Sequence, residues 1–127
     1  MNEQAADATI ASRRAHIVRV VESLPGAEIE ERGQHLSFAV AGKRFAWYLD
    51  DHHGDGRIAL SCKGEPGVNA VLADAQPGRF HIPKYVGPRG WIGLWLDLPD
   101  IDLEEVDRLV RTAYRLAAPK RLSRGLP

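Results

Sequence analysis

Positions 50–55 carry the side chains of this sequence that are best suited to binding a metal. They spell DDHHGD, and carboxylates and imidazoles are ligands of zinc and other divalent ions. The stretch does not match a calcium loop that starts at Asp51, because His53 occupies the third position and Cys62 the last, where glutamate is required. A zinc site usually draws ligands from more than one element, and no partner is evident. We therefore interpret residues 50–55 as a solvated hairpin loop and predict no metal site.

Side chains for nucleophilic or acid–base catalysis form no recognisable constellation. Cys62 is the single cysteine, and its place in line with Ile58 and Leu60 predicts burial, where a thiol is inert. A reactive thiol remains the alternative, because the neighbouring Lys63 could activate it. The histidines are scattered, and neither a Ser-His-Asp order nor a glycine-rich phosphate loop can be identified. We expect a protein that is not an enzyme and that needs no cofactor.

Basic and aromatic residues between positions 43 and 91 give a different candidate site, one for nucleic acid. Basic side chains neutralise phosphates, and an aromatic ring can stack on a base. The candidate contacts are Lys43, Arg44, Lys63, Lys84, Arg89 and Trp91, with Trp47 and Tyr85 nearby in the pattern. The alternative is that the tryptophans pack inside the protein. Residues 87–90, GPRG, match the GxxG string of KH domains, but they precede a predicted strand, so we interpret them as a turn.

The composition is that of one ordinary globular domain. The chain has 127 residues, 44% of them hydrophobic, and its 17 basic and 17 acidic side chains cancel. We expect a single domain over residues 1–127, in which any contact with nucleic acid must use a local basic patch. Acids cluster between Asp97 and Asp107, and bases between Arg108 and Arg124. We attribute this order to a helix whose charges complement its dipole, with a basic tail for a polyanion as the alternative.

Nothing in the sequence indicates export or a membrane. A single cysteine allows no internal disulfide, which fits a reducing compartment. The N-terminus is polar and acidic, unlike a secretory signal, and no apolar run approaches the ~20 residues of a membrane-spanning helix. We expect a cytoplasmic protein without a membrane partner, either a monomer or a weak homodimer.

Hydrophobic periodicity divides the chain into helices and strands. It predicts helices over 9–24, 66–75 and 102–118, strands over 27–32, 35–40, 43–50, 57–62 and 91–98, and frayed ends over 1–8 and 120–127. We expect Val68, Val71, Leu72 and Ala75 to face inward on their helix. Phe45, Trp47 and Leu49 should share one face of their strand. Strands joined by tight turns are antiparallel, and helices must cover a sheet face. The prediction is an α+β two-layer sandwich in the order α-β-β-β-β-α-β-α, with an antiparallel sheet covered on one face by helices.

A set of landmarks follows in order along residues 24–122. They are Leu24 to Glu28, Phe38 with Val40, Gly42-Lys43, Phe45 to Trp47, Leu60 to Lys63, Pro77 to Phe80, Gly90 to Ile92, and Ala113 to Leu116. Their order and spacing resemble the MmcQ/YjbR family of small bacterial proteins. The resemblance implies a two-layer fold similar to that of type III secretion chaperones and a DNA-binding role, and it brings no catalytic residues. Residues 1–10 and the loop 50–55 depart from the family pattern.

Two functional hypotheses follow. The first is a DNA-binding domain that uses the local basic patch of Lys43, Lys63, Lys84 and Arg89. The second is a non-enzymatic module that binds a protein or a small ligand through the sheet face or a groove near Trp91. Salt-dependent binding of DNA discriminates between them, because contacts to phosphate weaken as salt is added.

Overall fold

The computed structural model describes residues 4–124, and over these it has six strands in one antiparallel sheet and four α-helices. The strands are β1 (Ala27–Arg32), β2 (His35–Val40), β3 (Lys43–Asp50), β4 (Ile58–Cys62), β5 (Phe80–His81) and β6 (Ile92–Trp95), in the spatial order β1-β2-β3-β4-β6-β5. The helices are α1 (Asp7–Glu22), α2 (Val68–Ala75), α3 (Leu103–Ala117) and α4 (Lys120–Ser123). Within residues 4–124 no helix is long and apolar enough to cross a membrane. The predicted α+β sandwich is confirmed, with β5 and α4 added to the predicted order.

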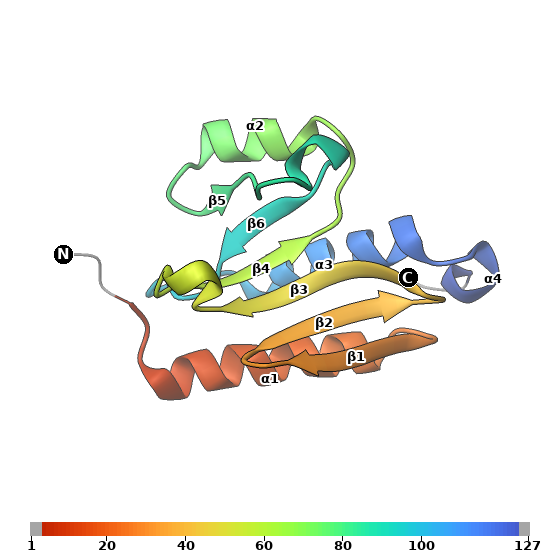
Figure 1. Ribbon diagram of the computed structural model, residues 1–127, viewed down its shortest axis with the longest axis horizontal. Helices are drawn as coiled ribbons and strands as arrows, with labels where there is room; N and C mark the ends of the chain where they lie inside the picture. The colour runs from red at the N-terminus through yellow and green to blue at the C-terminus, as the bar shows by residue number, and fades with distance from the viewer. Residues whose placement is uncertain (1–3, 125–127) are drawn as a thin grey trace.

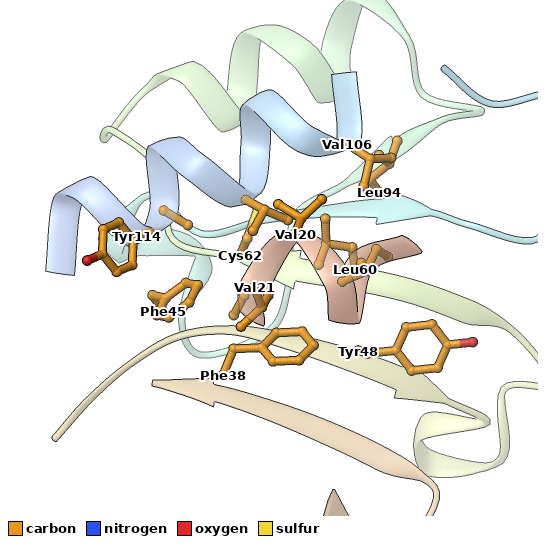
Figure 2. Close-up of a cluster of buried hydrophobic side chains, with 14 of the residues drawn as sticks. Val20, Val21, Phe38, Phe45, Tyr48, Leu60, Cys62, Leu94, Val106 and Tyr114 are labelled. Atoms are coloured by element: carbon orange, nitrogen blue, oxygen red, sulfur yellow. The ribbon is translucent and has the colours of Figure 1, made fainter. Parts of the chain in front are cut away.

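The helices cover one face of the sheet. Figure 1 shows α1 and α3 behind the strands. The core between the two layers, part of which is drawn in Figure 2, includes the buried side chains of Val21, Phe38, Phe45, Tyr48, Leu60, Cys62, Leu94, Val106 and Tyr114. We call the opposite side of the sheet the open face, because no α-helix of the described residues lies on it.

A β-bulge in β3 decides which side chains of this strand enter the core. Phe38 of β2 pairs with Ala46 of β3, and the next residue, Ala39, pairs with Arg44. At this point β3 therefore contains one residue more than β2, and the extra residue is Phe45. Such a bulge interrupts the alternation of side chains between the two faces of a strand.

The bulge overturns the predicted face assignment of β3. Phe45, Ala46 and Tyr48 are all buried in the core. Trp47 and Leu49 point the other way and line a groove on the open face. The prediction that Phe45, Trp47 and Leu49 share one face is wrong, because it assumed an uninterrupted period of two.

The last strand is shorter than the predicted span of 91–98. The guanidinium group of Arg13, buried on α1, donates hydrogen bonds to the carbonyls of Leu96 (2.7 Å), Leu98 (2.6 Å) and Pro99 (3.0 Å). These carbonyls are satisfied by a side chain from the helix layer instead of a neighbouring strand. Strand β6 accordingly ends at Trp95.

Helix α2 is rotated relative to the prediction. Asn69 is its buried residue, and its amide donates to the carbonyls of Gly87 (2.8 Å) and Trp91 (2.9 Å). Val68 and Val71 consequently face solvent, and Val71 is 67% exposed. The expectation that these two valines face inward is wrong, because a buried amide with two acceptors fixed the helix orientation.

The predicted fraying of the chain ends is also corrected where the structure describes them. Helix α1 already begins at Asp7. At the other end, Leu122 of α4 packs against the core beside Gly26, because burial of its apolar side chain is favourable. The parts of this prediction that concern residues 1–3 and 125–127 lie outside the described residues.

The packing of α4 is tested by Leu122→Ala. We expect the free energy of unfolding to fall by about 1–2 kcal/mol, because a partly buried leucine side chain loses its apolar contacts. Urea unfolding followed by circular dichroism measures this change. Arg121→Ala, on the exposed side of α4, is the control and should change stability by no more than ~0.5 kcal/mol. Equal stability of wild type and Leu122→Ala would contradict a packed α4.

Candidate functional site

The open face carries a groove of about 890 Å³ between two loops, which is within the range of about 300–1,000 Å³ found for small-molecule sites. Its floor is formed by strand side chains, namely Trp47, Leu49, Ser61, His81 and Trp95. One wall is the loop after β3, with His52, His53 and Asp55, and the other is the segment 82–86 after β5. The groove is therefore mostly aromatic and imidazole in character.

A stack of three side chains forms one side of the groove floor. The His81 ring stacks on the Trp95 indole with centroids 4.1 Å apart and planes inclined by 25°. The Arg57 guanidinium carbon lies 3.9 Å from the centroid of the same indole. His81 also lies directly over Gly93, where an added Cβ would come within 2.2 Å of the imidazole. A side chain at position 93 would therefore displace the His81 ring from its place on β6.

The surroundings of His81 favour the neutral imidazole. Burial lowers its pKa from the usual value, and the nearby positive charge of Arg57 lowers it further. Its Nδ1 is buried and, within the described residues, has no hydrogen-bond partner. His81 thus presents a flat ring, stacked on an indole, to the groove.

Arg57 is fixed by a carboxylate. Its Nε and one terminal nitrogen donate to the Asp97 carboxylate at 2.8 and 2.9 Å, and the backbone N–H of Ile58 donates to it at 2.9 Å. Burial alone would raise the pKa of Asp97, but these hydrogen bonds and the charge of Arg57 hold it below its usual value. The hydrogen bond to Asp97 likewise raises the pKa of Arg57. The ion pair with Asp97 keeps Arg57 charged and holds its guanidinium against the Trp95 indole.

Trp47 provides a second aromatic surface, on β3. The Arg44 guanidinium carbon lies 4.4 Å from its ring centroid, and Arg44 Nε donates to Ser37 Oγ at 3.0 Å. Trp47 is only partly buried. Its ring is therefore accessible from the groove while a basic side chain is stacked on it.

Three histidines line the groove near the β3–β4 loop. The rings of His35 and His52 meet edge to face at 5.5 Å, and those of His52 and His53 at 3.9 Å. Burial and the two neighbouring imidazoles lower the pKa of His52. Among residues 4–124 no group of three or more His, Cys, Asp or Glu side chains is arranged to hold a metal ion. The loop itself is exposed, as predicted.

Four of the six candidate nucleic-acid contacts lie at one end of the sheet. Lys43 and Arg44 open β3 at this end. Lys63 follows β4, and its backbone N–H donates to the carbonyl of Phe45 at 2.9 Å. The end of β4 is therefore beside the start of β3, because the two strands are antiparallel.

The start of β6 brings Arg89 to the same end. Gly64, the residue after Lys63, lies against Gly90, where an added Cβ would come within 2.3 Å of the Gly64 carbonyl oxygen. Arg89 is exposed and immediately precedes Gly90. The close approach of the two glycine backbones thus connects Lys63 to Arg89.

Helix α4 adds further bases at this end. Leu122 contacts Gly26, which also lies near Val40, the partner of Lys43 in the β2–β3 ladder. Figure 1 shows α4 at one end of the molecule and the β3–β4 loop at the other. We define the basic end by six residues from these segments, Lys43, Arg44, Lys63, Arg89, Lys120 and Arg121.

The two remaining candidates lie elsewhere. Lys84 belongs to the groove wall. Trp91 is only 8% exposed, so its ring is not available to stack on a ligand. Residues 87–90 form a turn before β6, as predicted. Cys62 is buried in the core, which raises the pKa of its thiol to about 12 and leaves it unreactive, as expected.

Trp95 and His81 are groove residues that sequence reasoning did not select. One usable signal was present for Trp95, because alternation places it opposite the buried Leu94. His81 gave no signal, since the two residues of β5 are too few to show a period. Its position follows only from pairing with Gly93 on β6.

The fold and the groove together define a class of protein. It is a small two-layer α+β domain with helices on one sheet face and a ligand-sized aromatic groove on the other. The YjbR family model matches residues 22–116, so the chain belongs to the YjbR family. This confirms the resemblance found in the sequence.

A solved structure supports the fold assignment. The chain is similar to the Deinococcus radiodurans protein DR2400, which carries a DUF419 domain, with a TM-score of 0.62 and 23% sequence identity. The match covers 77% of this chain and 72% of that one. Among curated proteins, none matches this chain. The similarity establishes the fold and leaves function to be argued from the site.

The contact between His81 and Gly93 is tested by Gly93→Ala. We expect a loss of about 1–3 kcal/mol in the free energy of unfolding, because the new methyl group would displace the imidazole from Trp95. The tryptophan fluorescence spectrum should change as well. Gly78→Ala, where an added Cβ meets nothing within 4 Å, is the control. If both variants behave like wild type, His81 does not lie over Gly93.

Proposed function

We propose that this chain is a non-enzymatic DNA-binding domain whose basic end contacts the phosphate backbone. The observation that carries the proposal is the convergence of basic residues from separate parts of the chain. Lys43 begins β3, Lys63 follows β4 and Arg89 lies in the turn before β6, so all three positions are at one end of the sheet. Clustered basic side chains attract polyanions even when the whole protein is neutral.

The charge distribution along α3 supports this proposal. Its first turn contains Glu104 and Glu105, and its last turn contains Arg115. The order agrees with the helix dipole, and α3 leads directly into the bases of α4 at the basic end. The two interpretations of this charge order, a helix whose charges complement its dipole and a basic tail for a polyanion, are therefore compatible.

The groove favours a second function, the binding of a small planar ligand. Its aromatic floor contains Trp47 and Trp95, and both rings border a cavity of ligand size. The sequence suggested the sheet face or a groove near Trp91 for this function, and this groove lies on the sheet face, without Trp91 in its lining. A thermal-shift series with small aromatic compounds tests this function, and a compound that stabilises wild type but not Trp47→Ala would support it.

The DNA-binding proposal predicts salt-sensitive affinity. Fluorescence anisotropy with labelled single-stranded DNA should show binding at ~50 mM salt that weakens by roughly 50-fold at ~200 mM if about four phosphates are contacted. Lys63→Ala and Arg89→Ala should each reduce the slope of log K against log salt by about 0.7, since each removes one phosphate contact.

Arg108→Ala is the matched control for this experiment. Arg108 is exposed and lies in the first half of α3, away from the basic end. Its removal should leave the salt slope unchanged. A wild-type affinity that does not change with salt would contradict a phosphate site at the basic end. An equal decrease of the slope in Lys63→Ala, Arg89→Ala and Arg108→Ala would contradict it as well.

A further inference from the structure

We infer that the groove on the open face receives unpaired bases of a single strand whose phosphates contact the basic end. This inference rests on the proposed DNA-binding function and specifies its ligand as single-stranded nucleic acid. Four observations carry it: the accessible aromatic rings, the lysine in the groove wall, the contact of Arg44 with Trp47, and the shape of the groove.

Two aromatic rings border the groove and remain accessible. Tyr85 is 91% exposed, although a tyrosine side chain usually buries much of its ring. Its backbone has a φ of +68°, a conformation that non-glycine residues rarely adopt. Trp47 on the floor is partly exposed. Because every base has a π-face, such rings bind bases with little regard to sequence.

Lys84 supplies a cation in the groove wall. It lies next to Tyr85. Asp55 is the one carboxylate among the described residues that line the groove, and its Oδ1 accepts a hydrogen bond from the backbone N–H of Arg57 at 2.8 Å. A phosphate that follows a base stacked on Tyr85 would therefore meet Lys84.

Arg44 connects the groove with the basic end. It belongs to the basic end through its place beside Lys43 at the start of β3, and its guanidinium stacks on Trp47. A strand whose phosphates lie along Lys43 and Lys63 would thus have its next bases over Trp47. Arg44 is thus the contact between the two surfaces, and it also lines a neighbouring hollow with Glu28 and Glu30.

The shape of the groove selects single strands over duplexes. Bases in a duplex are stacked on their neighbours and offer only their edges, whereas unpaired bases can be splayed out and stacked on aromatic side chains. A groove with accessible rings on its floor and wall can hold the faces of such bases. Duplex DNA would contact the basic end alone.

The test separates base contacts from phosphate contacts. Anisotropy is measured for three labelled probes of equal length: a pyrimidine single strand, a strand made only of abasic sites, and a duplex. We expect wild type to bind the base-bearing strand at least 10-fold more tightly than the abasic strand, since each stacked base contributes about that factor. Tyr85→Ala and Trp47→Ala should each reduce this ratio severalfold and leave the affinity for the abasic strand unchanged.

Controls and outcomes are distinct for the two proposals. Tyr85→Ala removes an exposed side chain and cannot unfold the core. Val71→Ala, at an exposed valine on α2, is the matched control and should keep the wild-type ratio of the two affinities.

Equal affinity for base-bearing and abasic strands would overturn the inference while supporting phosphate binding at the basic end. Binding to none of the probes would overturn both proposals. A ratio that neither aromatic variant changes would also overturn the inference, because the bases would then bind elsewhere.

Discussion

The bulge at Phe45 is the constraint on which both surfaces of the sheet depend. It places two consecutive residues of β3, Phe45 and Ala46, on the helix side, and it turns Trp47 outward. Phe45 then meets Tyr114 of α3 edge to face, with ring centroids 5.8 Å apart. The same bulge keeps Arg44 on the open face, where it reaches Trp47 and Ser37. Core packing and groove formation are thus two consequences of one extra residue in one strand.

On the other side of the groove, a series of contacts that starts at the Arg57–Asp97 ion pair fixes the side chains of the groove floor. Asp97 holds Arg57, Arg57 stacks on Trp95, and Trp95 holds His81 over Gly93. Each contact is planar or bidentate, so each restricts the rotation of the next side chain. Preorganisation of this kind reduces the ordering cost that a ligand would otherwise meet on binding.

The sequence predicted those features that depend on local patterns. Period-two alternation located β2, β3 and β4, and the predicted helix over 102–118 matches α3, which Asp102 caps by accepting from the N–H of Glu104 at 2.9 Å. The order of landmarks gave the family. Each of these patterns involves residues that are close together in the sequence or follow a fixed order, so it can be recognised without knowledge of the fold.

The remaining features depend on contacts between distant residues. The bulge arises from the pairing of β2 with β3 and leaves no trace in residue types. The orientation of α2 depends on Asn69 meeting two carbonyls about 20 residues away. The candidate nucleic-acid contacts were selected by residue type alone, and only the folded chain shows that four of them share one end while Lys84 borders the groove and Trp91 is buried.

The most direct test of the account is a two-dimensional ¹H–¹⁵N NMR titration of the protein with an unlabelled single-stranded oligonucleotide. The account predicts that the backbone amides of Lys43, Lys63 and Arg89 shift together with the indole N–H of Trp47, while the indole N–H of the buried Trp91 stays in place. Shifts confined to the outer surfaces of α1 and α3, with Trp47 and the basic end unaffected, would contradict both the phosphate site and the open-face groove as the surfaces that bind nucleic acid.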